Sequence, residues 1–97
     1  MGSFTREGGF QNREAFLAAL RRKLEHLRDG VLRGGALNWS EEGTATEASL
    51  AGFGARVVFR VEPARWTCAA ELPSFLPIPQ KMLEAKFDEE FEDLRGL

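Results

Sequence analysis

Apolar residues along the chain recur first at helical spacing, then at strand spacing, and then at helical spacing again. In residues 13–32 the large apolar side chains are three or four positions apart, which places them on one face of a helix. In residues 37–72 apolar and polar positions alternate in short runs, as in strands that bury one face. After residue 79 the helical spacing returns. The pattern therefore predicts a helix, a group of strands and a second helix, in this order.

Short strands are expected between the two helices, at residues 37–40, 44–50, 55–62 and 65–72. The turns between them are short, and a parallel pair would need a crossover of about a dozen residues, so the strands should form an antiparallel meander. The clearest alternation has Val57, Phe59 and Val61 on the face that we expect to be buried. On the next strand the expected inward positions are Trp66, Cys68, Ala70 and Leu72.

Two amphipathic helices and one sheet with an apolar face should pack in two layers, because this arrangement buries both apolar surfaces together. We therefore predict an α+β fold in which an N-terminal helix and a C-terminal helix pack on one face of a three- to four-stranded antiparallel meander. At 97 residues the chain should form a single domain over residues 1–97. Residues 1–11 contain three glycines and no clear apolar pattern, so we expect a loose N-terminal segment there.

The composition is typical of a folded globular protein and argues against several functional classes. With 43% apolar and 29% charged residues, the chain lies outside the range of disordered proteins. A net charge of -2 argues against nucleic acid as a partner, because binding the phosphate backbone needs an excess of lysine and arginine. No apolar run approaches the roughly 20 residues of a transmembrane segment, and a single cysteine fits a reducing compartment. We expect a soluble cytoplasmic protein.

Few residues in the chain are suited to catalysis. His26 has Asp29 three positions later, where a carboxylate can orient an imidazole, but no nucleophile accompanies the pair. Cys68 takes an inward strand position, where a thiol packs as a small apolar side chain. An enzyme would need both residues in one cleft. We therefore predict no catalytic residues, no metal site and no cofactor.

The two predicted helices carry opposite charges. The first contains the basic run Arg21, Arg22 and Lys23, and the second contains the acidic residues of the segment 88–93. Attraction between these charges would dock the helices on each other or pair two copies of the domain head to tail. The alternative is that both runs are simply solvated faces.

The connector before the second helix combines prolines with large apolar residues, and such extended segments usually lie on the surface. We expect an apolar binding patch here, together with the neighbouring turn. Its residues are Phe53, Phe75, Leu76 and Ile78. The occupant would be a protein partner, a second copy of the chain in a homodimer, or a hydrophobic granule surface. The alternative is that these side chains close the bottom of the small core.

A ligand pocket between the sheet and the closing helix is the second candidate site. Phe59, Trp66 and Phe87 would line it, as apolar side chains usually line small-molecule sites. A domain of 97 residues has little core to leave empty, and a dimer would enlarge the space.

Several motifs over residues 12–94 follow a recognisable order. A helix precedes Trp39 on an early strand, a glycine-centred turn at 53–57, a reversal at 61–66 and a closing helix at 78–94, with Leu72-Pro73 at the last strand end. This layout resembles the polyhydroxyalkanoic acid system family, small bacterial proteins of polyhydroxyalkanoate granules. The family's short N-terminal strand has no recognisable counterpart in residues 1–11.

The resemblance implies association with storage-polymer granules or their proteins in a bacterial cytoplasm, without a known catalytic activity. Our leading hypothesis from the sequence is therefore a small non-enzymatic interaction module that binds through the apolar patch. The alternative is a small carrier of hydrophobic ligands that uses the pocket between the sheet and the C-terminal helix. A ligand-dependent rise in melting temperature would favour the carrier.

Overall fold

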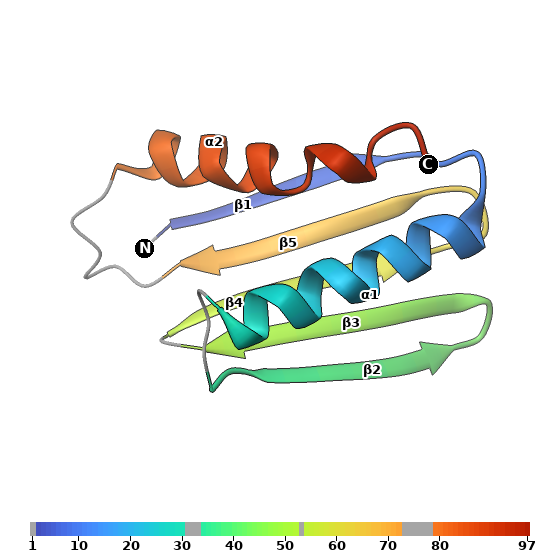
Figure 1. Ribbon diagram of the computed structural model, residues 1–97, viewed down its shortest axis with the longest axis horizontal. Helices are drawn as coiled ribbons and strands as arrows, with labels where there is room; N and C mark the ends of the chain where they lie inside the picture. The colour runs from blue at the N-terminus through green and yellow to red at the C-terminus, as the bar shows by residue number, and fades with distance from the viewer. Residues whose placement is uncertain (1, 31–33, 53, 73–78) are drawn as a thin grey trace.

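The computed structural model describes residues 2–30, 34–52, 54–72 and 79–97. The elements are β1 (Gly2–Gly8), α1 (Arg13–Asp29), β2 (Ala36–Glu42), β3 (Ala45–Gly52), β4 (Ala55–Val61), β5 (Trp66–Leu72), α2 (Gln80–Glu90) and a short 3-10 helix, η1 (Glu92–Leu94). The strands form one five-stranded antiparallel sheet in the order β1-β5-β4-β3-β2 (Figure 1).

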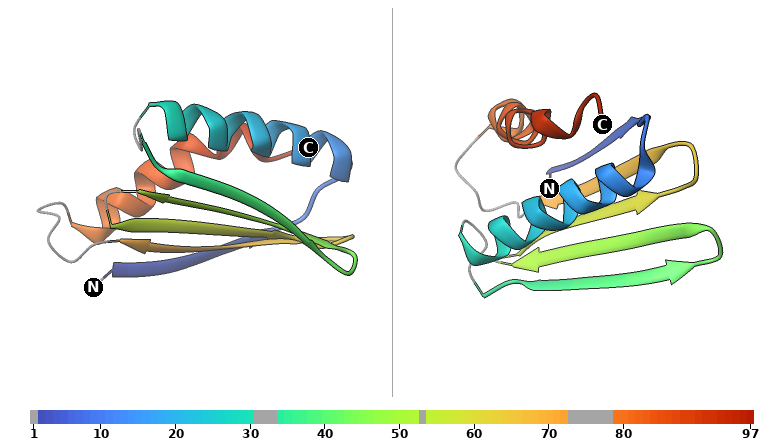
Figure 2. Two further views of the ribbon diagram at one scale, coloured as in Figure 1. Left: turned by 90° about the horizontal axis from the view of Figure 1, so that it is seen from below. Right: turned by 45° about the vertical axis from the view of Figure 1, so that its right-hand side comes forward.

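Both helices pack on the same face of the sheet, and no described element covers the opposite face (Figure 2). The helix α2 runs beside β1, whereas α1 lies toward the half of the sheet that contains β2 and β3 (Figure 1). The predicted α+β fold, with antiparallel strands and both helices on one face, is therefore confirmed. The meander from β2 to β5 follows the predicted strand order.

The N-terminal residues form an edge strand, so the prediction of a loose segment over residues 1–11 is wrong for residues 2–8. The strand β1 pairs with β5 along its whole length, with Gly8 opposite Trp66. Its inward positions are Phe4, Arg6 and Gly8. Because an arginine and a glycine take two of these three positions, the alternation of apolar and polar residues is hidden in the sequence. This strand raises the sheet from the predicted three or four strands to five.

The helix α1 begins where the apolar pattern predicts it. The Asn12 side chain accepts a hydrogen bond from the Ala15 N–H at 3.1 Å, which caps the first turn. At the other end the Gly30 N–H donates to the His26 carbonyl at 2.9 Å. Three residues of the predicted apolar stripe are fully buried: Phe16, Leu20 and Leu24. The predicted end of this helix, at residue 32, lies outside the described residues.

The core lies between the inner face of the sheet and the two helices. On β4 and β5 the buried residues are those that the alternation predicts, namely Phe59, Val61, Cys68 and Ala70. The hairpin between β2 and β3 turns at Gly43, whose φ of 63° is a left-handed conformation that favours glycine. Phe91 and Leu94, at the end of the helical stripe after Gln80, complete the core.

The opposite charges of the two helices meet at Lys23. Its Nζ lies 3.3 Å from a carboxylate oxygen of Asp93 and 3.7 Å from one of Glu90. The charges therefore dock the first helix on the C-terminal segment, which was one of the two arrangements expected from the sequence. Partly exposed ion pairs of this kind contribute little energy, so the contact orients the helices more than it stabilises them.

Candidate functional site

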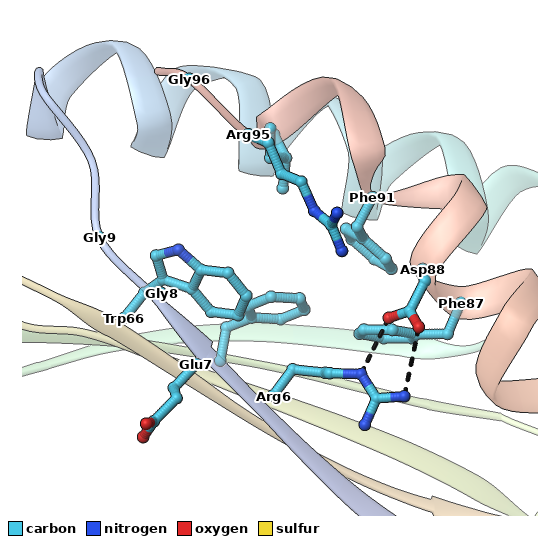
Figure 3. A pocket seen from close by; sticks show the side chains of 12 residues that line it. Arg6, Glu7, Gly8, Gly9, Trp66, Phe87, Asp88, Phe91, Arg95 and Gly96 are labelled. Atoms are coloured by element: carbon cyan, nitrogen blue, oxygen red, sulfur yellow. Dashed lines mark hydrogen bonds and ion pairs between the residues drawn. The ribbon is translucent and has the colours of Figure 1, made fainter.

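A pocket of about 280 Å³ lies between the sheet and α2 (Figure 3). Aromatic rings form its wall, two from the sheet and two from the C-terminal segment: Phe59, Trp66, Phe87 and Phe91. The three residues that the sequence analysis assigned to a ligand pocket, Phe59, Trp66 and Phe87, therefore line one and the same cavity. Ligand binding itself stays a prediction.

The four rings pack around Phe59. The centroid of its ring lies 5.2 Å from that of Phe91, 6.0 Å from that of Trp66 and 6.3 Å from that of Phe87. The rings of Phe87 and Phe91 are 4.5 Å apart. These separations are in the range at which aromatic pairs attract one another. Each ring is held by its neighbours, so the apolar wall is formed before any ligand arrives.

Gly8 gives the Trp66 ring its place on the inner face of β1. A Cβ atom added to Gly8 would lie 3.0 Å from three atoms of the indole ring. A side chain at this position would therefore require the Trp66 ring to shift by a few tenths of an ångström. Gly8 and Gly9 also line the pocket, so small residues form one side of its rim.

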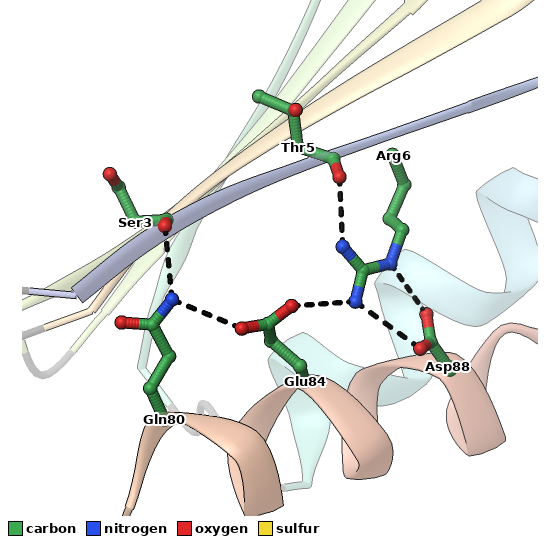
Figure 4. Close-up of polar contacts among 6 residues, drawn as sticks. All are labelled: Ser3, Thr5, Arg6, Gln80, Glu84 and Asp88. Carbon is green, nitrogen blue, oxygen red and sulfur yellow. Dashed lines mark hydrogen bonds and ion pairs between the residues drawn. The ribbon is translucent and has the colours of Figure 1, made fainter.

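Arg6 forms a polar side of the pocket and binds β1 to α2 (Figure 4). Its Nε donates to Asp88 Oδ1 at 2.9 Å, and its Nη2 donates to Glu84 Oε1 at 2.8 Å. Its Nη1 donates to the Thr5 carbonyl at 2.9 Å. The guanidinium also lies over the Phe4 ring, with 5.0 Å between Cζ and the ring centroid. Arg6 is thus held from several sides and is not available to a ligand.

The bonds from Arg6 lower the pKa values of both carboxyl groups on α2. For Asp88 and for Glu84 the hydrogen bond from Arg6 is the main cause. Gln80 adds a second bond to Glu84, from its Nε2 to Oε2 at 3.0 Å, and the same Nε2 lies 3.3 Å from the Ser3 carbonyl oxygen. The same network raises the pKa of Arg6. The contact between β1 and α2 is therefore fully charged at neutral pH.

We expect the melting temperature of the protein to fall more steeply in acid than that of an Arg6→Met variant. A carboxyl group with a lowered pKa in the folded state stabilises the fold above its unfolded pKa, and this contribution is lost as the pH falls through the folded value. The ordinary values are 4.5 for Glu84 and 3.8 for Asp88, so the loss begins as the pH falls below about 5.

Thermal melts followed by circular dichroism between pH 7 and pH 3 measure this difference. An Arg22→Met variant is the control, since Arg22 is exposed on α1 and lies outside the network. It should keep the steep slope of the unmodified chain. Parallel slopes for the unmodified chain and Arg6→Met would show that the network does not hold α2 on β1.

Arg95 and Gly96 form the opposite side of the rim. The Leu97 carbonyl accepts backbone hydrogen bonds from Gln11 at 2.8 Å and from Asn12 at 2.7 Å, which fixes this segment at the start of α1. Gly96 has a φ of 88°, which turns the chain back toward the sheet. The Arg95 side chain extends from this segment toward the aromatic rings (Figure 3). A second guanidinium therefore lines the pocket.

The two residues considered for catalysis are not brought together. His26 is exposed on α1, where it lines a shallow hollow with Lys23 and Asp93. Cys68 is buried on β5 and does not line that hollow. Its burial confirms the prediction that it packs in the core.

The apolar patch predicted from Phe53, Phe75, Leu76 and Ile78 lies outside the described residues. Within the ranges 2–30, 34–52, 54–72 and 79–97, no group of three or more histidine, cysteine, aspartate or glutamate residues is arranged to hold a metal ion. The helices described are all too short or too polar to cross a membrane.

A broader hollow of about 800 Å³ lies on the uncovered face of the sheet, around Val58, Thr67 and Ala69. Two charged groups there pair with each other, with Arg60 Nη1 at 3.5 Å from Glu47 Oε2. The hollow is wide and shallow and contains no aromatic ring. The inner pocket is therefore the stronger candidate site.

No protein-family model matches the chain, and no curated protein matches it. Among solved structures the chain is similar to the one described as the crystal structure of Ara h 8.0201. The TM-score is 0.48 and the sequence identity is 10%, over 97% of this chain and 93% of that chain. A likeness at this level assigns no function. The resemblance to the polyhydroxyalkanoic acid system family stays a prediction.

Sequence reasoning did not assign several residues to the pocket. Phe91 was part of the predicted helical stripe, so its inward direction could be predicted, although it was not assigned to the pocket. Asp88 was noted only as a member of an acidic run. Arg6 fell in the segment that was expected to be loose, and no pattern singled out Arg95. The pairing of Arg6 with α2 joins residues about eighty positions apart, and no local pattern reports such a contact.

Proposed function

We propose that the protein binds a small hydrophobic ligand in the pocket between the sheet and α2. The observation that carries this proposal is the convergence of four aromatic rings on one cavity of about 280 Å³. Small-molecule sites usually combine an apolar, largely pre-formed wall with a few polar groups at defined positions. The ring cluster and the guanidinium of Arg95 match this description.

The volume indicates how much of a ligand the pocket can enclose. A water molecule takes about 30 Å³ in the liquid, so a cavity of about 280 Å³ has room for roughly ten non-hydrogen atoms. A benzene ring with a short substituent or an acyl chain of about eight carbons is of this size. Because the wall consists of rings, an aromatic ligand gains stacking and edge contacts in addition to apolar burial.

The pocket is suited to binding rather than to catalysis. Among its described lining residues there is no serine, cysteine or histidine that could act as a nucleophile or base. Asp88, the carboxylate beside the rings, accepts two hydrogen bonds from Arg6. Its lowered pKa keeps it ionised at neutral pH, so it is a poor general base or acid.

We expect 3-phenylpropan-1-ol and 1-octanol to raise the melting temperature of the protein in a saturable manner. A Phe87→Ala variant should bind them about tenfold more weakly, because one ring of the wall is lost. Differential scanning fluorimetry over a ligand titration measures both effects. Titration of a Trp39→Phe variant, in which Trp66 is the only tryptophan left, reports binding at the pocket through fluorescence.

A Met82→Ala variant is the matched control on the same helix. Met82 is 60% exposed and does not line the pocket, so its removal should leave the affinity unchanged. The proposal is overturned if no saturable shift occurs with either ligand. It is also overturned if Phe87→Ala, while folded, responds like the unmodified chain.

The interaction module remains an untested hypothesis. It depends on Phe53, Phe75, Leu76 and Ile78, which lie outside the described residues. Association with storage-polymer granules depends on the family resemblance alone. The pocket is the site for which the described residues give direct geometric support.

A further inference from the structure

We propose that the ligand of this pocket carries a carboxylate and that Arg95 binds it at the rim. This inference rests on the proposed function, and it adds a charge requirement and a specific residue to the site. The apolar part of the ligand would lie on the rings of Phe59, Trp66, Phe87 and Phe91. Its carboxylate would face residues 95–96.

The two arginines of the pocket differ in their partners. Each of the three guanidinium nitrogens of Arg6 already donates, to two carboxylates and to a backbone carbonyl. Arg95 has no carboxylate oxygen within 4.0 Å of its guanidinium in the part of the chain that the structure describes. Its side chain nevertheless extends toward the rings (Figure 3). Arg95 is therefore the arginine whose N–H groups can donate hydrogen bonds to a ligand.

Asp88 lies near Arg95, but its carboxylate is already bound by Arg6 and does not occupy the Arg95 guanidinium. Arg6 holds both carboxylate oxygens of Asp88, through Nε to Oδ1 at 2.9 Å and Nη2 to Oδ2 at 3.3 Å. Arg95 and Asp88 line the same pocket, with the Arg95 side chain extending toward the rings (Figure 3). A ligand carboxylate would be repelled by Asp88 and attracted by Arg95. The ligand would therefore bind with its charged end toward residues 95–96.

Backbone hydrogen bonds on both sides hold the main chain of Arg95 in place, while its side chain is exposed. Its own N–H donates to the Glu92 carbonyl at 3.0 Å, and the Leu97 carbonyl accepts from Gln11 and Asn12. A guanidinium on a fixed backbone loses less conformational freedom on binding than one on a free chain end. Its planar donors match a carboxylate in a bidentate manner, which makes the pair specific for this group.

The test compares 3-phenylpropanoate with 3-phenylpropanamide, which has the same size and shape but no charge. Isothermal titration calorimetry should show that the unmodified chain binds the acid about tenfold more tightly than the amide. Arg95→Gln should lower the affinity for the acid about tenfold and leave that for the amide unchanged. Arg95→Lys should keep part of the preference. Added salt should weaken the binding of the acid only.

An Arg22→Gln variant is the matched control, because Arg22 is exposed and does not line this pocket. It should keep the full preference for the acid. If the unmodified chain binds acid and amide equally, the inference is wrong while the proposed function stands. If Arg95→Gln keeps the preference for the acid, Arg95 is not the anion partner and the inference is likewise wrong. If neither compound binds, the proposed function fails as well.

Discussion

Replacing Phe16 with alanine is expected to lower the free energy of unfolding by about 3 to 5 kcal/mol. Phe16 is 0% exposed at the first turns of α1. Its ring lies 5.3 Å from that of Phe10 and is stacked at 5.8 Å on that of Trp66, measured between centroids. Alanine would leave a cavity between α1 and the sheet that the rigid strands cannot fill. A small domain has a total stability of about 5 to 15 kcal/mol, so the loss would be a large part of it.

Urea denaturation followed by circular dichroism measures this loss. Phe16→Leu keeps most of the side-chain volume and should cost less than about 1.5 kcal/mol. Met82→Ala removes a side chain that is 60% exposed and should change stability by no more than about 0.5 kcal/mol. A loss below about 1 kcal/mol for Phe16→Ala would mean that α1 does not pack on the sheet as described.

The thiol of Cys68 is expected to react with iodoacetamide about a thousandfold more slowly in the folded protein than in the unfolded chain at pH 8. Cys68 is 3% exposed on the inner face of β5. Burial raises its pKa from 9.0 to about 12, although the charge of Arg6 acts in the opposite direction. Only the thiolate reacts, and its fraction at pH 8 falls by about three powers of ten with this change in pKa.

Mass spectrometry after timed alkylation, with and without urea, gives the two rates. The chain contains a single cysteine, so one added label reports one site. A mutation that lowers stability, such as Phe16→Ala, should speed the reaction in the absence of urea, because the open state becomes more populated. Equal rates with and without urea would mean that Cys68 is not in the core, and a reactive role for it would then have to be reconsidered.

The strands β2 to β5 and the start of α1 were predictable because the apolar residues of each element recur at the spacing of that element. On β4, Phe59 and Val61 alternate with Arg60, and both are buried as predicted. The helical stripe from Phe16 to Leu24 is likewise buried. Tight turns leave only antiparallel pairing open to these strands, so the order β2-β3-β4-β5 follows from the sequence.

The strand β1 was not predictable by the same means. Its inward position at Arg6 is tolerated only because Glu84 and Asp88 of α2 accept its hydrogen bonds. Gly8 takes an inward position opposite Trp66, where the absence of a side chain leaves room for the indole ring. In each case the partner lies more than fifty residues away, so local patterning gives no reason to expect a strand.

The aromatic half of the candidate site was predictable and the charged half was not. Phe59 and Trp66 are inward positions on neighbouring strands, so their meeting follows from the alternation. Arg6 is positioned at the pocket by the pairing of the edge strand β1 with β5. Arg95 is positioned there by the hydrogen bonds of Leu97 to the start of α1. These are long-range contacts, and they set the charge that a ligand would meet.

By itself, the sequence determined the class of the fold, the order of β2 to β5 and the aromatic wall, because the burial of apolar side chains acts through spacings of two and of three to four residues. Only the tertiary structure decided that the first residues complete the sheet, that Arg6 is neutralised by α2 and that Arg95 faces the rings. Hydrogen bonds and charge pairs between distant segments have no period along the chain, so they can be identified only in the folded structure.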